Sequence, residues 1–173
     1  MPPLPDDMFL VHPDGTDSGP AETTLSFTRA PSVLIAFAGN RFTRSASRHY
    51  QKAFGIGAMD WRMLVMLTRE PGSPVSHAAR TIGIDKAAVS RSLRRLEKSG
   101  LAVPESHGSD ERRKNWTLTA EGQALHDRIL QAALERQAKL LEGFTKKETE
   151  AFAGSLRRFL ANLDALNAED GDQ

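Results

Sequence analysis

The chain has 173 residues, no cysteine, and 23 Lys or Arg against 22 Asp or Glu, for a formal net charge of +1. This length suits one sizeable core with flanking helices better than two independent domains. The lack of cysteine excludes disulfides and thiolate metal sites, and no apolar run is long enough for a membrane span, so we expect no membrane partner. The sequence starts Met-Pro-Pro-Leu-Pro-Asp-Asp, without the pattern of an export signal, so we expect a cytoplasmic location.

The charged residues are unevenly distributed along the chain. Residues 74–119 hold nine Lys or Arg against five Asp or Glu, whereas residues 1–30 hold one against five. A local basic excess is the electrostatic pattern expected of a nucleic-acid-binding segment, even when the whole chain is nearly neutral. An ordinary charged surface would also fit these numbers. The choice between it and a nucleic-acid-binding segment therefore depends on the predicted helices and strands.

The N-terminal residues and the first helix differ in composition. Residues 1–30 are rich in Pro, Gly, Asp and Thr and have few apolar residues, which predicts a mobile N-terminal arm. Residues 31–56 then place apolar side chains at helical spacing, with Pro31 suited to a first turn and Gly55 and Gly57 ending the pattern. We interpret this segment as an N-terminal dimerisation helix, because it would be longer than a small domain is wide.

Two short helices are expected next. The first contains Trp61 and ends at Glu70-Pro71-Gly72, where proline and glycine stop it. The second is predicted to use Ser73 as its cap and Pro74 in its first turn, and to end at Gly83.

A basic helix from Asp85 to Gly100 follows after a three-residue break. Asp85 is the expected cap and Gly100 the expected terminator. The apolar positions Val89, Leu93 and Leu96 are spaced to pack inward. The same helix contains Lys86, Ser90, Arg91, Arg94 and Arg95. This arrangement matches helix-turn-helix geometry, although such helix pairs also occur in all-α proteins of other function.

A hairpin predicted after the basic helix favours the DNA-binding interpretation over an all-α protein of other function. Residues 101–103 and 116–118 are predicted strands joined by a polar loop, which would form a wing. Thr119 is expected to cap a long helix, and Thr145 with Glu148 to open a last helix with a wide apolar face. The predicted fold is mainly α with a small β-hairpin wing. A winged helix-turn-helix domain at 57–119 is flanked by dimerisation helices at 31–56 and 120–167, with a disordered tail at 168–173.

These residues resemble the MarR family of bacterial transcriptional regulators, over roughly Gly57 to Gly122. The likeness rests on Ala79-Arg-Thr-Ile-Gly83-Ile-Asp85, Val89-Ser90-Arg91, Leu93, Leu96-Glu97, Gly100-Leu101, Asp110-x-Arg112-Arg113 and Leu118-Thr119-x-x-Gly122. The resemblance implies a winged-helix homodimer that binds palindromic operator DNA. It also implies a transcriptional regulator, most often a repressor, that a small ligand releases or occasionally recruits.

The resemblance also implies DNA-binding roles for individual residues. The groove-facing residues of the basic helix would be Lys86, Ala87, Ser90, Arg91 and Arg94. Arg112 would enter the minor groove next to Arg113, and Asp110 would orient Arg112 through a charge-assisted pair. Family members often have basic residues where this chain has Pro104 and Glu105, and an arginine in place of Glu111, which predicts a wing of lower affinity.

In the resembled family, effectors bind between the dimerisation helices and the winged domain. The candidate ligand-binding residues here are Arg41, His49, Trp61 and Arg62, which would suit a small anionic aromatic molecule such as a phenolic carboxylate. Interface salt bridges and a core tryptophan would account for the same residues.

Other chemistry finds little support in the sequence. The five histidines fall in separate elements without metal-ligand spacing, and no serine has His and Asp partners at suggestive spacing. We therefore expect no metal, no cofactor and no enzymatic activity. Two rival functions stay open: a ligand-responsive protein-interaction module, and an architectural DNA binder without sequence preference.

Overall fold

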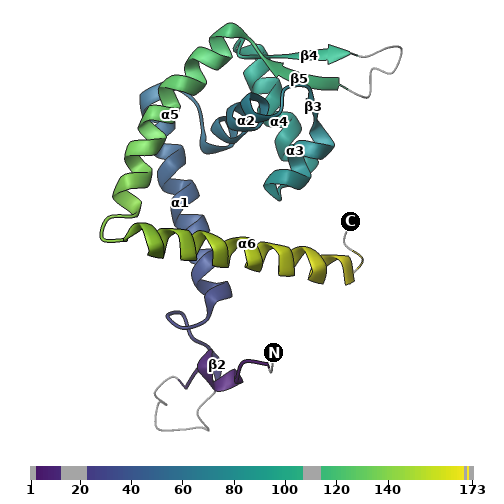
Figure 1. Cartoon of the computed structure of the whole chain (residues 1–173). Coiled ribbons are helices and arrows are strands. Elements are labelled where there is room, and N and C mark those ends of the chain that lie inside the picture. The colour runs from purple at the N-terminus through teal and green to yellow at the C-terminus, as the bar shows by residue number, and fades with distance from the viewer. Residues whose placement is uncertain (1–2, 13–22, 107–113, 170, 172–173) are drawn as a thin grey trace, which may run out of the picture. The chain divides into compact units, whose positions relative to one another are not determined.

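The structure is a computed structural model, and it describes residues 3–12, 23–106, 114–169 and 171. The chain forms two compact units, Met1–Ile129 and Leu130–Gln173, and one helix runs from the first unit into the second. The predicted fold class, mainly α with a small hairpin wing, is confirmed (Figure 1).

The N-terminal residues contain regular structure where composition predicted none. A short 3₁₀ helix, η1 (Asp6–Met8), precedes β1 (Leu10–Val11), which pairs antiparallel with β2 (Thr24–Leu25). Ser26 is buried, and its Oγ accepts hydrogen bonds from two following backbone N–H groups at 3.3 and 3.2 Å. Side-chain bonding of this kind lets a polar segment turn in a defined way, which composition alone does not reveal. The mobility of residues 1–30 stays a prediction.

Helix α1 (Pro31–Phe54) confirms the first predicted helix. Proline occupies its first turn, and Gly55 ends it in the left-handed conformation at φ 74°. Only Ala46 and Tyr50 of this long helix are buried. Most of α1 therefore lacks a covering surface within the described chain.

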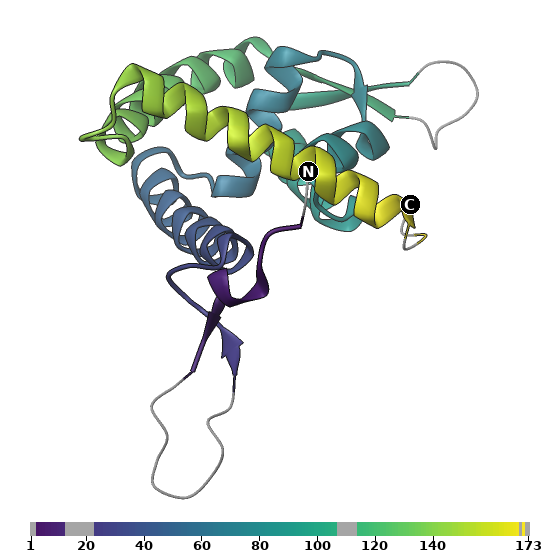
Figure 2. The same cartoon turned by 60° about the horizontal axis from the view of Figure 1, so that its bottom comes forward.

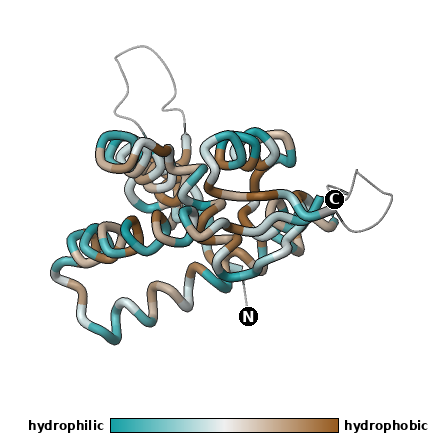
Figure 3. Tube along the Cα trace, turned by 90° about the horizontal axis from the view of Figure 1, so that it is seen from above, coloured by the Kyte–Doolittle hydropathy of each residue, from teal (hydrophilic) through white to brown (hydrophobic). Residues whose placement is uncertain are grey.

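The core of the first unit lies where α2 (Ala58–Arg69) and α3 (Val75–Ile82) meet α4 (Lys86–Lys98). Its large, fully buried apolar side chains are Met63, Leu64 and Leu67 of α2 and Val89, Leu93 and Leu96 of α4, together with Ile129 from the helix after the wing. Burying each large apolar side chain contributes about 1.5–3 kcal/mol. Figure 3 colours the chain by hydropathy, and brown hydrophobic positions alternate there with teal hydrophilic ones along the helices.

A three-stranded antiparallel sheet completes this unit, in the order β3-β5-β4. Its strands are β3 (Ser73–Pro74), β4 (Ala102–Ser106) and β5 (Lys114–Leu118). The prediction that Ser73 and Pro74 begin a helix was wrong, because Ser73 pairs with Trp116 and Pro74 has the extended ψ of 156°. A residue before proline is biased toward extended conformations, and α3 starts only at Val75.

The last two helices are α5 (Ala120–Leu140) and α6 (Lys146–Glu169). Both predicted caps are confirmed. Thr119 Oγ1 accepts from the Gly122 N–H at 3.0 Å, and Thr145 and Glu148 bond each other reciprocally at 2.8 and 3.3 Å. Helix α6 has no buried residue in the described chain, and its exposed large apolar side chains are Phe152, Leu160, Leu163 and Leu166.

Candidate nucleic-acid interface

The connection between α3 and α4 has the form of a helix-turn-helix. Gly83 ends α3 in the left-handed conformation, and the N–H groups of Gly83 and Ile84 both bond the carbonyl of Ala79, at 2.9 and 3.1 Å. Asp85 then caps α4, accepting from the Ala88 N–H at 2.7 Å, as the sequence predicted. A turn fixed at both ends holds α4 at a defined angle to α3.

Helix α4 has two distinct faces. Its inner residues Val89, Leu93 and Leu96 are at most 1% exposed and lie in the core, as predicted. Lys86, Ala87, Arg91 and Arg94 are exposed and Ser90 is half-buried. At 3.6 residues per turn these five residues span an arc of about 140° on the opposite side of the helix. The residues implied as groove-facing therefore share one surface that is rich in cations.

Arg95 belongs to α4 but differs from the other arginines of the helix. Its Nη2 donates to Asp60 Oδ1 at 2.6 Å and its Nε to Asp60 Oδ2 at 3.3 Å. The side chain of Asp60, at the start of α2, is only 11% exposed. Periodicity alone placed Arg95 among the cations of this helix, and it could not show that the guanidinium has an internal partner.

The wing begins as a regular hairpin. Strands β4 and β5 pair from Ala102↔Leu118 to Ser106↔Lys114, and they extend together from the helical part of the unit (Figure 2). Thr117 Oγ1 donates to Glu105 Oε1 across the strands at 3.0 Å, so Glu105 has a role in the hairpin itself. The predicted DNA-binding residues Asp110, Arg112 and Arg113 lie outside the described residues.

The segment Leu118-Thr119-x-x-Gly122 anchors the end of the wing to the end of α4. Thr119 Oγ1 donates to the Gly100 carbonyl at 2.7 Å, and the Thr119 N–H donates to the Leu101 carbonyl at 3.1 Å. A Cβ on Gly122 would lie 1.9 Å from the oxygen of Leu101. Only glycine therefore lets α5 start this close to the α4–β4 connection.

A cluster of rings joins α1, α2 and α5 in the first unit. The Trp61 ring lies 5.9 Å from Tyr50 and stacks on His126 at 5.3 Å between centroids. His49 contacts Tyr50 edge-on at 5.6 Å. Of the predicted ligand-binding residues, His49 and Trp61 thus lie in one cluster, with Tyr50 between them.

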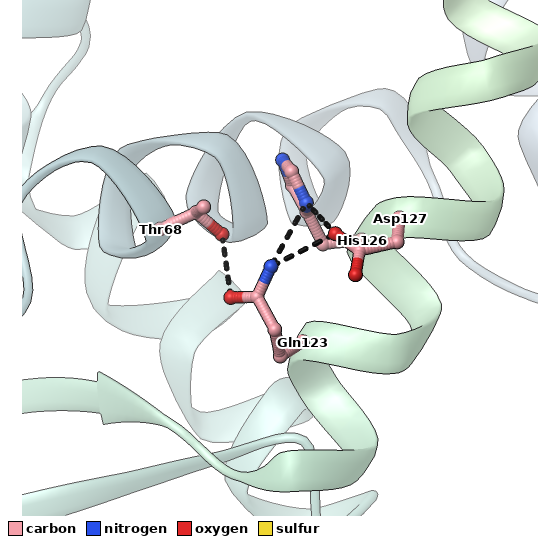
Figure 4. Close-up of polar contacts among 4 residues, drawn as sticks. All are labelled: Thr68, Gln123, His126 and Asp127. Atoms are coloured by element: carbon pink, nitrogen blue, oxygen red, sulfur yellow. Dashed lines mark hydrogen bonds and ion pairs between the residues drawn. The ribbon is translucent and has the colours of Figure 1, made fainter.

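His126 is held by a polar network that Figure 4 shows. Its Nδ1 donates to Asp127 Oδ1 at 2.9 Å, and Gln123 Nε2 donates to the same oxygen at 2.9 Å. Thr68 of α2 donates to Gln123 Oε1 at 3.3 Å. The hydrogen bond from His126, and then that from Gln123, lower the pKa of Asp127 below its usual value. Sequence reasoning missed His126, since a lone histidine in a helix has no local signal.

The other two predicted ligand-binding residues have different surroundings. Arg62 Nη2 donates to Thr43 Oγ1 of α1 at 2.9 Å, which links α1 to α2. Arg41 is exposed on α1, about 12 Å along the helix axis from His49 at 1.5 Å per residue. A groove of about 680 Å³ follows α1, lined by residue pairs one turn apart from Ile35–Ala36 to Ser47–Arg48. Among the four predicted residues, none lines this groove.

Among the described residues, no group of three or more His, Asp or Glu side chains lies close enough to hold a metal ion. No helix there combines the length and apolar character needed to cross a membrane.

Two helices joined by a short fixed turn, packed on a third helix and followed by a paired hairpin, define a winged helix-turn-helix protein. Residues 54–113 match the model of the MarR family. The MarR/EmrR family transcriptional regulator from Acinetobacter sp. ADP1 is 29% identical, with a TM-score of 0.76 over 82% of this chain and 99% of that chain. The winged-helix part of this chain is thus similar to the MarR family of transcriptional regulators in both sequence and fold.

Two more distant structures share the fold. S. aureus MepR in complex with DNA is 22% identical, with a TM-score of 0.67 over 80% of this chain and 99% of that chain. The PcaV regulator from Streptomyces coelicolor in complex with its natural ligand is 20% identical, with a TM-score of 0.66 over 80% of this chain and 96% of that chain.

Proposed function

We propose that this chain is a sequence-specific DNA-binding regulator that places α4 in the major groove of its operator. The observation that supports this most strongly is the division of α4 into a buried apolar face and an outer face with Lys86, Arg91 and Arg94 exposed. Arginine recognises guanine by donating to the O6 and N7 atoms of the base. Arginine and lysine side chains also neutralise DNA phosphates. That MepR, which shares the fold, forms a complex with DNA supports the same use here.

The wing extends this proposal to the minor groove. Arg112 and Arg113 would contact the groove next to the one that α4 occupies, and Asp110 would orient Arg112. The sequence resemblance supports these roles, as do the paired strands on either side of the three residues. A narrow A·T-rich minor groove concentrates negative potential, which favours an arginine over a neutral side chain.

The regulator would act as a homodimer on a palindromic operator. On α1 the exposed apolar residues include Leu34, Phe37 and Phe42, and on α6 they include Phe152 and Leu160, each at least 37% exposed. Helices with so little burial gain little stability from tertiary packing, so a second copy is the proposed cover. Dimerisation would present two α4 helices to half-sites about 10 bp apart or a multiple of that.

We further propose that the protein is a repressor released by a small anionic aromatic ligand. The ring cluster of Trp61, Tyr50 and His126 offers aromatic faces. His49 contacts the Tyr50 ring, and Arg62 follows Trp61 in the sequence. That PcaV, which shares the fold, forms a complex with its natural ligand supports a ligand site in this protein. Ligand binding would favour a spacing of the two α4 helices that does not match the operator.

Selection from random DNA tests this function directly. Rounds of binding and sequencing should enrich a two-fold symmetric sequence with half-sites about 10 bp apart. Truncation of a base-contacting Arg94 to Ala should weaken binding to the selected sequence by about 1–3 kcal/mol. Retained DNA without a common sequence would instead identify an architectural binder, and no retained DNA would favour a protein-interaction module.

A further inference from the structure

A buried carboxylate connects the start of α2 to α4. Asp60 is 8% exposed, and its Oδ1 accepts from Ser92 Oγ at 2.5 Å and from Arg95 Nη2 at 2.6 Å. Ser92 is fully buried, and Arg95 Nε adds a third bond at 3.3 Å to the other oxygen. Both partners belong to α4, one turn apart, so a single side chain of α2 fixes α4 at two points.

The position of Asp60 suits an acidic side chain. It lies in the first turn of α2, where the positive end of the helix dipole favours a negative charge. The guanidinium and the hydroxyl supply the hydrogen bonds that a carboxylate removed from water requires. Substituting Asp60 removes the acceptor of the fully buried Ser92 hydroxyl and of the Arg95 guanidinium at once, which makes this contact sensitive to substitution.

Arg95 borders the proposed DNA-binding face. At 100° per residue it lies about 40° beyond Arg91 around the helix, and its side chain is 54% exposed. A guanidinium in that place could reach a DNA phosphate if it were free to turn outward. The two bonds to Asp60 direct it inward instead.

We propose that Asp60 is a positioning residue for sequence-specific binding. It sets the orientation of α4 through Ser92 and Arg95, and it keeps Arg95 from adding a phosphate contact that carries no sequence information. This inference rests on the proposed DNA-binding function. Its particular consequence is that the loss of Asp60 affects specific and non-specific binding in opposite directions.

Asp60→Asn and Glu97→Gln form a matched pair for the test. Each removes one negative charge from the region of α4, but Glu97 is exposed and its carboxylate makes no hydrogen bond or ion pair to a described residue. With Asp60→Asn, affinity for the selected operator should fall at least tenfold. Affinity for shuffled DNA should rise severalfold, and the slope of log affinity against log salt for shuffled DNA should steepen by about one. With Glu97→Gln both affinities should rise together, leaving their ratio unchanged; equal behaviour of the two variants would overturn the proposal.

A double substitution separates positioning from direct contact. If Asp60 acts through Arg95 and Ser92, Arg95→Ala lowers operator affinity without raising affinity for shuffled DNA, and adding Asp60→Asn to Arg95→Ala causes a smaller loss than Asp60→Asn causes alone. Losses that multiply in the double variant would mean that Arg95 itself contacts the operator, and the proposal would be wrong. Ser92→Ala removes one hydrogen bond to Asp60 with little change in volume. It should lower the ratio of operator affinity to shuffled-DNA affinity, as Asp60→Asn does, but by a smaller factor.

Amide hydrogen exchange provides a test of the Asp60 proposal that needs no DNA. Amides of α4 should exchange faster in Asp60→Asn than in wild type or Glu97→Gln, while amides of α6 stay unchanged. If wild-type protein shows no sequence preference, the proposed function fails, but the exchange result still decides whether Asp60 holds α4. Unchanged α4 exchange together with an unchanged specificity ratio would contradict the inference.

Discussion

The imidazole of His126 stacks on the indole of Trp61, with ring centroids 5.3 Å apart and planes 25° from parallel. His126 belongs to α5 and Trp61 to α2, so this contact joins the helix that leaves the winged domain to the helix that supports α4. A flat ligand that separated or replaced this stack would act on both helices at once.

An aromatic carboxylate should therefore stabilise the protein and weaken its binding to DNA. Each ligand of a panel would be scored by the shift in Tm and by the loss of operator affinity, with His126→Ala as the variant expected to lose both effects. The Trp116→Phe variant leaves Trp61 as the only tryptophan, so that its fluorescence reports occupancy. Trp116 suits this change because its Nε1 has no hydrogen-bond partner among the described residues. A panel that moves neither quantity would remove the aromatic-acid proposal.

The wing should respond in opposite directions to two substitutions. Arg112→Ala removes the proposed minor-groove contact and should weaken operator binding strongly. Glu111→Arg replaces an acid of the proposed wing by a base, and it should tighten binding and steepen the salt dependence. Electrophoretic mobility shifts over a salt series would measure both, and affinities equal to wild type in both variants would show that the wing does not touch DNA.

Gly122→Ala should destabilise the first unit. The added Cβ would lie 1.9 Å from the backbone oxygen of Leu101, which no side-chain rotation can relieve. We expect a loss of about 1–3 kcal/mol in the free energy of unfolding, typical of overpacking.

Gly154→Ala on α6 is the control, because the nearest neighbour of its added Cβ would be the flexible end of an arginine side chain at 3.9 Å. Helix propensity predicts a gain of up to about 1 kcal/mol there, measured by urea unfolding. Equal effects of the two alanines would contradict the contact.

Asp127 should contribute stability that acid removes. Hydrogen bonds from His126 and then Gln123 lower the pKa of its carboxyl in the folded protein. A carboxyl whose pKa is lower in the folded than in the unfolded state stabilises the fold above its unfolded pKa of about 3.9. That contribution disappears as the pH falls through the lower folded value. The difference in unfolding free energy between wild type and Asp127→Asn should thus be constant near pH 7 and shrink below about pH 3.9. Asp164→Asn, on an exposed site of α6, is the control. A difference that persists in strong acid would contradict this origin.

Much of the fold follows from local sequence signals. Asp85, Thr119 and Thr145 form the caps that their positions before apolar periodic segments predict. The inward positions of α4 follow from their spacing. These features depend on residues within one or two turns of each other, which is the range that periodicity and capping patterns describe.

The features that the sequence did not predict depend on distant partners. Ser73 lies in a strand because Trp116, more than 40 residues later, pairs with it. Asp60 and Arg95, or Trp61 and His126, come together only when α2 has packed on its neighbours. The sequence could not place His126 in the ring cluster for the same reason, since His126 is far from Trp61 and Tyr50 along the chain.

Fluorescence anisotropy over a salt series tests the central claim most directly. The purified protein would be titrated into labelled DNA from upstream of its own gene and into shuffled DNA of equal composition. The account predicts tight binding that prefers the native sequence and weakens steeply with salt, because the exposed cations of α4 displace counterions from phosphates. Equal or negligible binding to both DNAs at every salt concentration would contradict sequence-specific regulation by this chain.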